Sequence, residues 1–170
     1  GLTKFTVPVD GGLMNTSVAV VQADPGGSAE EAELNASTKA LVMNTGTITA
    51  DGGRVVLVGA SGVAQQVVNQ SGTVRARSLV NRGGEIVLEA IGASVDGAAG
   101  LEVGGTLDAR GDAAGVKGGE IRTSAGNLSV LEGTKIHAGG GAGGGNGSWT
   151  AEGGQNLTIV GDGDTGNIAA

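Results

Sequence analysis

A short phrase built from Gly-Thr, an aliphatic residue, one intervening residue and Ala recurs along the chain, and it constrains the fold more than any other feature. Successive aliphatic anchors are 26, 33 and 29 residues apart. Periods in this range are typical of repeat architectures. The copies are GTITA (46–50), GTVRA (72–76), GTLDA (105–109) and GTKIHA (133–138), with anchors Ile48/Ala50, Val74/Ala76, Leu107/Ala109 and Ile136/Ala138.

Two further series of short apolar segments keep step with this phrase. The second series follows each copy: GGRVVL (52–57), GGEIVL (83–88), GGEIRT (118–123) and the weaker NGSWTA (146–151). The third series precedes the next copy: VVNQ (67–70), LEV (101–103), LSVL (128–131) and LTIV (157–160). Three β-type segments per period, separated by Gly, Asn and Asp, indicate a coil of strands.

We therefore predict an all-β fold, a three-sided parallel β-helix, over residues 44–170. Each strand of such a coil points alternate side chains inward, and each coil pairs with the coil below at about 4.8 Å. The loops between the strands project outside the stack, so their lengths can differ from coil to coil. This explains how periods of unequal length occur in one stack. No helix is expected in this part of the chain.

The composition agrees with a narrow core. The 170 residues include 36 Gly, one Trp and one Phe but no Tyr and no Cys, while 39% are hydrophobic. A core with so few aromatic residues must consist of many small, similar layers, and Gly suits corners that need positive φ or close backbone approach. The absence of Cys excludes a disulfide framework.

The charge balance excludes several partners. Ten basic residues against 17 acidic ones give a net charge of −7, which argues against a nucleic-acid surface.

The longest apolar runs, such as 55–58, are too short for a membrane helix. We therefore expect neither nucleic-acid binding nor membrane insertion. The chain starts Gly-Leu-Thr, and we expect a processed product or a fragment.

The alignment also predicts outward-facing neighbours. Arg75 should lie beside Asp108 on adjacent coils, and Arg54 should lie beside Glu85. Each such cross-strand pair contributes about 0.2–1 kcal/mol. Val56 and Val87 fall on the outward face, so we expect another segment to cover one of them.

Residues 1–43 are predicted to supply that cover by packing beside the first coils. KFTVPV and TSVAVV, within 1–23, alternate like strands. Ser28 and Glu31 form a capping box ahead of good helix formers, which predicts a short helix over 29–41. The shielding hypothesis fails if Val56 or Val87 is fully exposed.

The order of three phrases resembles a known family. NTGTITADGGRVVL (44–57), VVNQSGTVRARSLVNRGGEIVLEA (67–90) and VGGTLDARG (103–111) are similar to segments of the large bacterial exoproteins typified by filamentous haemagglutinin. The resemblance covers about residues 40–140. It implies a right-handed β-helix, export through a dedicated outer-membrane transporter of the two-partner route, and a secreted or cell-surface role in adhesion, biofilm or cell contact.

One tripeptide raises a specific binding hypothesis. Arg110-Gly111-Asp112 directly follows the third anchor pair and would present a guanidinium and a carboxylate to an adhesion receptor if it lay on an exposed loop. The favoured alternative is that it is an ordinary corner of the repeat, because the first two copies also have polar, Gly-containing corners there. We predict the corner and retain the adhesive turn as a minority hypothesis.

Other motifs favour structural roles. The glycine run 139–147 lacks the Lys-Ser/Thr of a phosphate loop, and GDGDTGN (161–167) lacks the terminal Glu of a calcium loop. His137 has no second ligand nearby in the sequence, and Trp149 falls in an inward position. We therefore predict no metal site, no cofactor and no catalytic residues.

The sequence leaves two functions open. The first is a non-enzymatic segment of a secreted adhesin, a rod that contacts an unidentified host-cell or matrix receptor or glycan. The alternative is a structural subunit that associates end to end, because the ends of a β-helix are unpaired strand edges. An enzyme ranks behind both.

Overall fold

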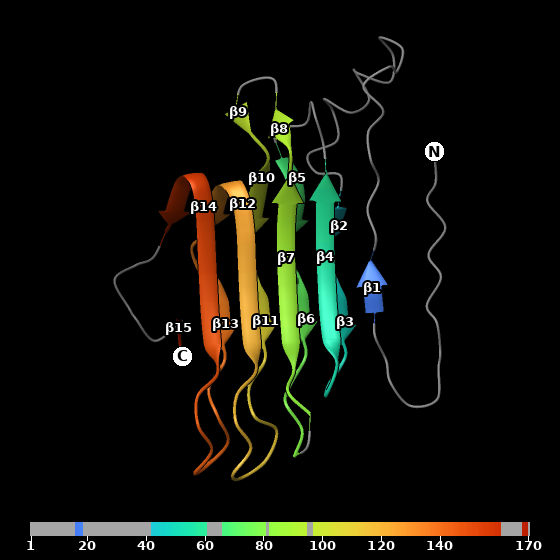
Figure 1. Ribbon diagram of the computed structural model, residues 1–170, viewed down its shortest axis with the longest axis vertical. Coiled ribbons are helices and arrows are strands. Elements are labelled where there is room, and N and C mark those ends of the chain that lie inside the picture. The colour runs from blue at the N-terminus through green and yellow to red at the C-terminus, as the bar shows by residue number, and fades with distance from the viewer. Residues whose placement is uncertain are drawn as a thin grey trace.

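The chain forms a parallel β-solenoid of about four turns in the computed structural model (Figure 1). The structure describes residues 16–18, 42–60, 66–80, 82–94, 97–160 and 168–169. These residues form strands and turns without any helix, and the helix predicted over 29–41 lies outside them. No helix in the described part of the chain is long and apolar enough to cross a membrane.

The strands have two to seven residues, except β12 with 11 and β14 with 12. They are β1 (Thr16–Val18), β2 (Val42–Asn44), β3 (Thr47–Thr49), β4 (Arg54–Ala60), β5 (Gln66–Gln70), β6 (Thr73–Arg75), β7 (Glu85–Ile91), β8 (Ala93–Ser94), β9 (Gly97–Ala98), β10 (Gly100–Val103), β11 (Thr106–Asp108), β12 (Glu120–Val130), β13 (Lys135–His137), β14 (Ser148–Ile159) and β15 (Ile168–Ala169).

The Gly-Thr repeat forms a five-stranded parallel sheet in the order β15-β13-β11-β6-β3. Its aligned anchors share one register column, as predicted: Ile48, Val74, Leu107 and Ile136. Ile168 on β15 pairs with Ile136. This fifth member of the column was missed in the alignment, because no Gly-Thr precedes it.

The second and third series form an eight-stranded sheet. Along one part of it, Arg54, Glu85, Glu120 and Ser148 pair in succession. Along the other part, the paired column is Val42, Val68, Leu101, Leu128 and Leu157. The predicted register of the second series is therefore confirmed. The segments grouped in the third series do pair with one another, with Val68 rather than Val67 opposite Leu101, and β2 adds an earlier copy that the alignment did not contain.

The last two coils differ from the prediction of three separate strands per period. In β12 and β14 the second and third series run together as one strand, with a bulge between Ala125 and Asn127. Only residues 124–127 separate the two series in β12, so no room remains for a projecting loop. In the coil of β7, by contrast, residues 89–100 separate the second series from the third. The short strands β8 and β9 pair in antiparallel fashion within this longer spacer.

The core is a set of aliphatic columns. Leu57, Ile86, Leu88, Leu107 and Ile121 are among its largest fully buried side chains. Each buried aliphatic side chain contributes about 1.5–3 kcal/mol through removal of apolar surface from water. Strands point alternate residues inward. Each inward position of a strand, repeated on successive coils, therefore forms one buried column, and these columns together make up the core.

The two outward valines are both half-buried, so the condition that would overturn the shielding hypothesis is not met. Val56 lies on β4, whose edge pairs in parallel with β1, and Val87 lies on β7. The predicted division at residue 43 and the proposed cover by other residues of 1–43 stay predictions.

Glycines start the long strands because their backbones approach the neighbouring coils closely. Gly84, Gly119 and Gly147 precede β7, β12 and β14 on successive coils. Glu120 N donates to Gly84 O at 3.0 Å, and Ser148 N donates to Gly119 O at 3.1 Å. A Cβ atom on Gly119 would collide with the carbonyl group of Gly84 and would lie tightly against the carbonyl oxygen of Ala109. Side chains are therefore excluded from this column.

Gly119→Ala should destabilise the protein by about 1–3 kcal/mol, because the added methyl group forces the stacked backbones apart. Gly139→Ala is the matched control, since a Cβ there meets nothing within 4 Å and its φ is not in the left-handed region. Urea unfolding of the two variants tests this. Equal unfolding free energies would contradict the close-approach explanation.

One polar side chain interrupts an apolar column. Gln70 is fully buried in the column that continues with Val103 and Val130. Its Oε1 accepts a hydrogen bond of 2.8 Å from Asn44 Nδ2, while its Nε2 has no partner among the described residues. A buried donor without a partner costs about 1–3 kcal/mol.

Gln70→Met should raise the unfolding free energy by about 1 kcal/mol, because it removes that donor while nearly keeping the side-chain volume. Asn44 Nδ2 loses its acceptor, Gln70 Oε1, in this variant, but Asn44 is only half-buried and its amide can donate to water instead. Thermal and urea unfolding provide the measurement. A clear loss of stability would show that Gln70 Nε2 is hydrogen-bonded in solution.

Candidate functional site

Arg110-Gly111-Asp112 forms one rung of the coil stack rather than a projecting loop. Ser78 N donates to Arg110 O, and Asp112 N donates to Ser78 O, each at 2.9 Å. On the other side, Gly111 N donates to Gly139 O at 2.9 Å. The tripeptide backbone is thus held between the coils before and after it, as a corner of the repeat requires.

Both charged side chains of the tripeptide are engaged within the protein. Arg110 Nε and Nη2 each donate to Asp108 at 2.9 Å, a bidentate contact. Asp112 lies 3.6 Å from Arg77. The Arg110 and Asp112 side chains are 47% and 46% exposed. A receptor would have to compete with these intramolecular ion pairs.

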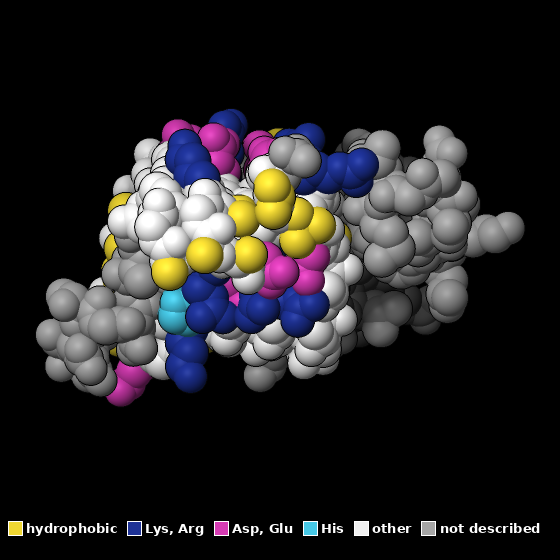
Figure 2. All heavy atoms as spheres, turned by 90° about the horizontal axis from the view of Figure 1, so that it is seen from below, with side chains coloured by type: hydrophobic (Ala, Val, Ile, Leu, Met, Phe, Trp, Pro, Cys, Tyr) yellow, Lys and Arg dark blue, Asp and Glu magenta, His cyan; other side chains and the backbone are white. Residues whose placement is uncertain are grey.

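These contacts belong to a larger cluster at the end of the five-stranded sheet, which we call the Arg–Asp network. Arg75 donates to both carboxylate oxygens of Asp51, at 3.1 and 2.6 Å. Arg77 Nε donates to Asp108 at 2.9 Å. Figure 2 shows the basic and acidic side chains as a row beside the single histidine. The members of the network are Asp51, Arg75, Arg77, Asp108, Arg110 and Asp112.

Asp108 is the centre of the network, and its side chain is only 6% exposed. Burial pushes the pKa of Asp108 upward, but hydrogen bonds from Arg110 and Arg77 outweigh it and hold that pKa well below its usual range. The Asp51 carboxylate raises the pKa of Arg75, and Asp108 raises that of Arg110. The carboxylate of Asp108 therefore stays charged in the folded protein.

The predicted outward pairs have different outcomes. Arg54 and Glu85 are neighbours and form an ion pair at 2.9 Å, as predicted. Arg75 and Asp108 are neighbours in register, also as predicted. Their ion pairs, however, run to other residues, because Arg75 binds Asp51 and Asp108 binds Arg77 and Arg110.

The alignment contained a signal for the missing partners. The residues that directly follow the anchor alanines are Asp51, Arg77 and Arg110. They stand next to the column of Arg75 and Asp108. Long arginine side chains therefore reach carboxylates in either column, and inspecting both columns together would have found the network.

His137 pairs in register with Asp108 and is half-buried. Burial lowers the pKa of His137, Arg110 and Lys135 lower it further, and Asp108 acts in the opposite direction. Burial and cationic neighbours thus favour the neutral imidazole. The described residues contain no group of three or more His, Cys, Asp or Glu side chains placed to hold a metal ion.

The glycine run forms an ordered corner stacked on the preceding corner. Gly115 N donates to Ala142 O at 2.8 Å, and Gly141 N donates to Val116 O at 2.9 Å. Trp149 is partly buried against the core and pairs with Ile121, as its inward register predicted. Residues 161–167, the possible calcium loop, lie outside the described residues.

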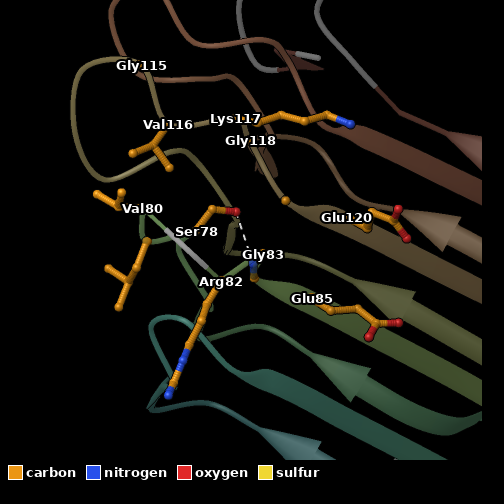
Figure 3. Close-up of a pocket in the computed structure, with 13 residues that line it drawn as sticks. Ser78, Val80, Arg82, Gly83, Glu85, Gly115, Val116, Lys117, Gly118 and Glu120 are labelled. Atoms are coloured by element: carbon orange, nitrogen blue, oxygen red, sulfur yellow. Dashed lines mark hydrogen bonds between the residues drawn. The ribbon is translucent and has the colours of Figure 1, made fainter.

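A groove of about 570 Å³ lies between two of these corners (Figure 3). The corner after β6 contributes Leu79 and Val80, and the corner before β12 contributes Val116. Val80 is 78% exposed. Glu85 and Glu120 point away along the strands in Figure 3, and each is paired with an arginine, Glu85 with Arg54 and Glu120 with Arg122. The groove also includes Ser78, Arg82 and Lys117, so it offers a mixed apolar and polar contact surface rather than a carboxylate pair free for acid–base chemistry.

No protein-family model, no curated protein and no solved structure matches this chain.

Asp108→Asn should lower the unfolding free energy by about 3 kcal/mol near neutral pH, because it leaves two arginines around an uncharged buried group. The folded-state pKa of Asp108 is depressed, so its stabilising contribution is present above the unfolded pKa of about 3.9. That contribution is lost as the pH falls from there toward the folded-state pKa. The difference between wild type and variant should therefore shrink in strongly acidic solution.

Glu120→Gln is the control for this experiment. Its ion pair with Arg122 is 3.0 Å long but lies on the surface, with side chains 54% and 61% exposed. Such pairs contribute about 0.2–1 kcal/mol. Urea unfolding across a pH series measures both variants. If Asp108→Asn behaves like Glu120→Gln at neutral pH, Asp108 does not stabilise the stack.

Proposed function

We propose that this chain is a non-enzymatic segment of a secreted bacterial surface adhesin, a rod that carries weak contact surfaces away from the cell. The observation that supports it best is the in-register stack of strands, in which each coil repeats the columns of the previous one. Such a stack extends in one direction without changing its cross-section. The resemblance of its repeat phrases to filamentous haemagglutinin-type exoproteins points to the same role.

The finer geometry is part of this proposal. Three strand series per period support a three-sided coil. Parallel connections between strands of one sheet are right-handed in about 98% of cases, which supports a right-handed β-helix. Export through a two-partner outer-membrane transporter and a place outside the cell follow from the resemblance.

The contact surfaces would be the corners at one end of the coils. There the groove with the exposed Leu79 and Val80 lies close to the Arg–Asp network, and Figure 2 shows apolar side chains beside the row of charges. Exposed apolar patches with a charged rim are typical of protein contact sites. One such patch is small, so useful attachment would depend on many copies acting together.

A binding assay tests the adhesive role. Beads coated densely with the purified chain should adhere to host cells or to components of the extracellular matrix, and the soluble chain should compete only at high concentration. A glycan array run in parallel separates sugar from protein receptors. Beads that attach to no cell, matrix protein or glycan would contradict the proposal.

Within this assay, Asp112→Ala should leave both the fold and the adhesion unchanged, because it keeps the backbone hydrogen bond to Ser78 and removes only a 3.6 Å side-chain contact with Arg77 at the network's edge. Val80→Lys, at the most exposed apolar side chain of the groove, should reduce adhesion several-fold. Circular dichroism verifies that both variants are folded. Loss of adhesion in Asp112→Ala alone would revive the Arg110-Gly111-Asp112 hypothesis.

A further inference from the structure

Asn146 is the one asparagine of the chain that is directly followed by glycine. In such a pair the main-chain nitrogen of the glycine can attack the side-chain amide of the asparagine, because glycine has no Cβ atom to hinder the approach. The pair ends the glycine-rich corner 139–147, directly before β14. Figure 1 shows this corner beside the corner that joins β11 to β12. The sequence therefore favours a reaction of the main chain at this point.

The fold holds the attacking nitrogen in another interaction. Gly147 N donates a hydrogen bond of 2.7 Å to Ala138 O, and the next amide, Ser148 N, donates to Gly119 O at 3.1 Å. A Cβ atom on Gly147 would collide with the carbonyl oxygen of Gly119, so Gly147 lies tightly against the preceding coil. While these contacts persist, the nitrogen cannot turn toward the Asn146 side chain.

The side-chain amide of Asn146 is held more loosely. Its Oδ1 accepts a hydrogen bond from Gly140 N across the corner at 3.3 Å, which is long for a bond of this type. A donor at Oδ1 draws electron density away from Cγ, so this contact does not protect Cγ from attack. The contacts of Asn146 and Gly147 lie within their own coil and the coil before it. The protection of the amide therefore depends on the position of Gly147 N.

We propose that Asn146 is a latent deamidation site, which the folded corner protects and which reacts when the corner opens. In the reaction Gly147 N loses its proton to the solvent and forms a bond to Asn146 Cγ. The bond between Cγ and Nδ2 breaks, and Nδ2 takes up a proton and leaves as ammonia. Water then opens the succinimide ring at either carbonyl. One product is aspartate at position 146, and the other is isoaspartate, whose main chain contains an additional carbon atom.

The isoaspartyl product does not fit the stacked corner. The additional carbon atom lies directly before Gly147, whose hydrogen bond to Ala138 and close contact with Gly119 require the original chain length. The start of β14 should therefore detach. Trp149, the one tryptophan of the chain, lies there, packs against the core and donates from Nε1 to Thr123 Oγ1 at 3.1 Å. Its emission should report the change.

Peptide mass spectrometry tests the protection. The chain is incubated in mildly alkaline buffer, once folded and once unfolded in guanidinium chloride. The unfolded chain should gain the mass of an amide-to-acid conversion at Asn146, and the folded chain should do so about tenfold more slowly, because its reaction requires local opening. Asn127 and Asn156 are internal controls, since each precedes leucine and should stay intact. Equal rates in both states, or an unreactive Asn146 in the unfolded chain, would overturn the proposal.

Two glycine variants test whether opening of the corner sets the rate. Gly141→Ala places a Cβ atom against the carbonyl group of Ala113 in the preceding corner and should accelerate deamidation of the folded chain several-fold. Gly139→Ala is the matched control, because its Cβ atom meets nothing within 4 Å. Hydrogen exchange at the Gly147 amide should show the same order. If the two variants react equally fast, opening of this corner is not the cause. If Gly141→Ala does not fold, the comparison of folded and unfolded wild type still decides.

Tryptophan emission tests the structural consequence. In the wild type, emission should shift to longer wavelength as isoaspartate accumulates. Asn146→Gln should keep its mass and emission constant, because the longer side chain forms the cyclic intermediate much more slowly. Asn146→Asp introduces the charge without lengthening the main chain, so its initial emission should match that of the wild type. An isoaspartyl product with unchanged emission would contradict the proposed detachment of β14.

Discussion

Parallel pairing in register is the constraint on which the rest of this structure depends. It places each residue of one coil against the equivalent residue of the next. The residue type at a position must therefore suit the residues above and below it in the same column. In the core the result is repetition of aliphatic residues, as at Val74, Leu107 and Ile136. The buried Gln70 shows the cost of departing from this rule, since its neighbours on the later coils are valines that offer no hydrogen-bond partner.

The same constraint is unfavourable for charged residues. If a charged residue type were repeated along a column, like charges would lie one strand spacing apart and would repel each other. The Arg–Asp network limits this repulsion by combining opposite signs along two adjacent columns. Arg75 and Asp108 carry opposite charges in one column, and Asp51 and Arg77 do so in the next. Arg110 follows Arg77 in that second column, and the carboxylate of Asp108 binds both arginines. The Arg75 and Arg77 side chains reach diagonally to a carboxylate of a neighbouring coil, at 2.6 Å for Asp51 and 2.9 Å for Asp108.

This periodicity explains which features the sequence could predict. The columns headed by Ile48 and Arg54 follow from counting along the repeat, because hydrogen bonds between coils enforce the count. The choice of ion-pair partner could not be read in this way, since a flexible Arg75 reaches Asp51 as easily as Asp108. Nor could the joining of two series within β12, which depends on the length of the spacer 124–127 rather than on any repeated residue.

The joined strands also explain why the two ends of the stack differ. β4 ends after seven residues, and the three residues of β1 pair with it at Val55 to Leu57. β14 is longer because its two series are continuous, so it presents an unbroken edge with core positions at both ends, Trp149 and Ile159. Leu157 and Ile159 are 48% and 47% exposed, yet they stand in register with Leu128 and Val130, which are at most 2% exposed. The apolar residues of the columns therefore continue into β14 even where the described residues cover them on one side only, so the column rather than the burial of the single residue determines the residue type.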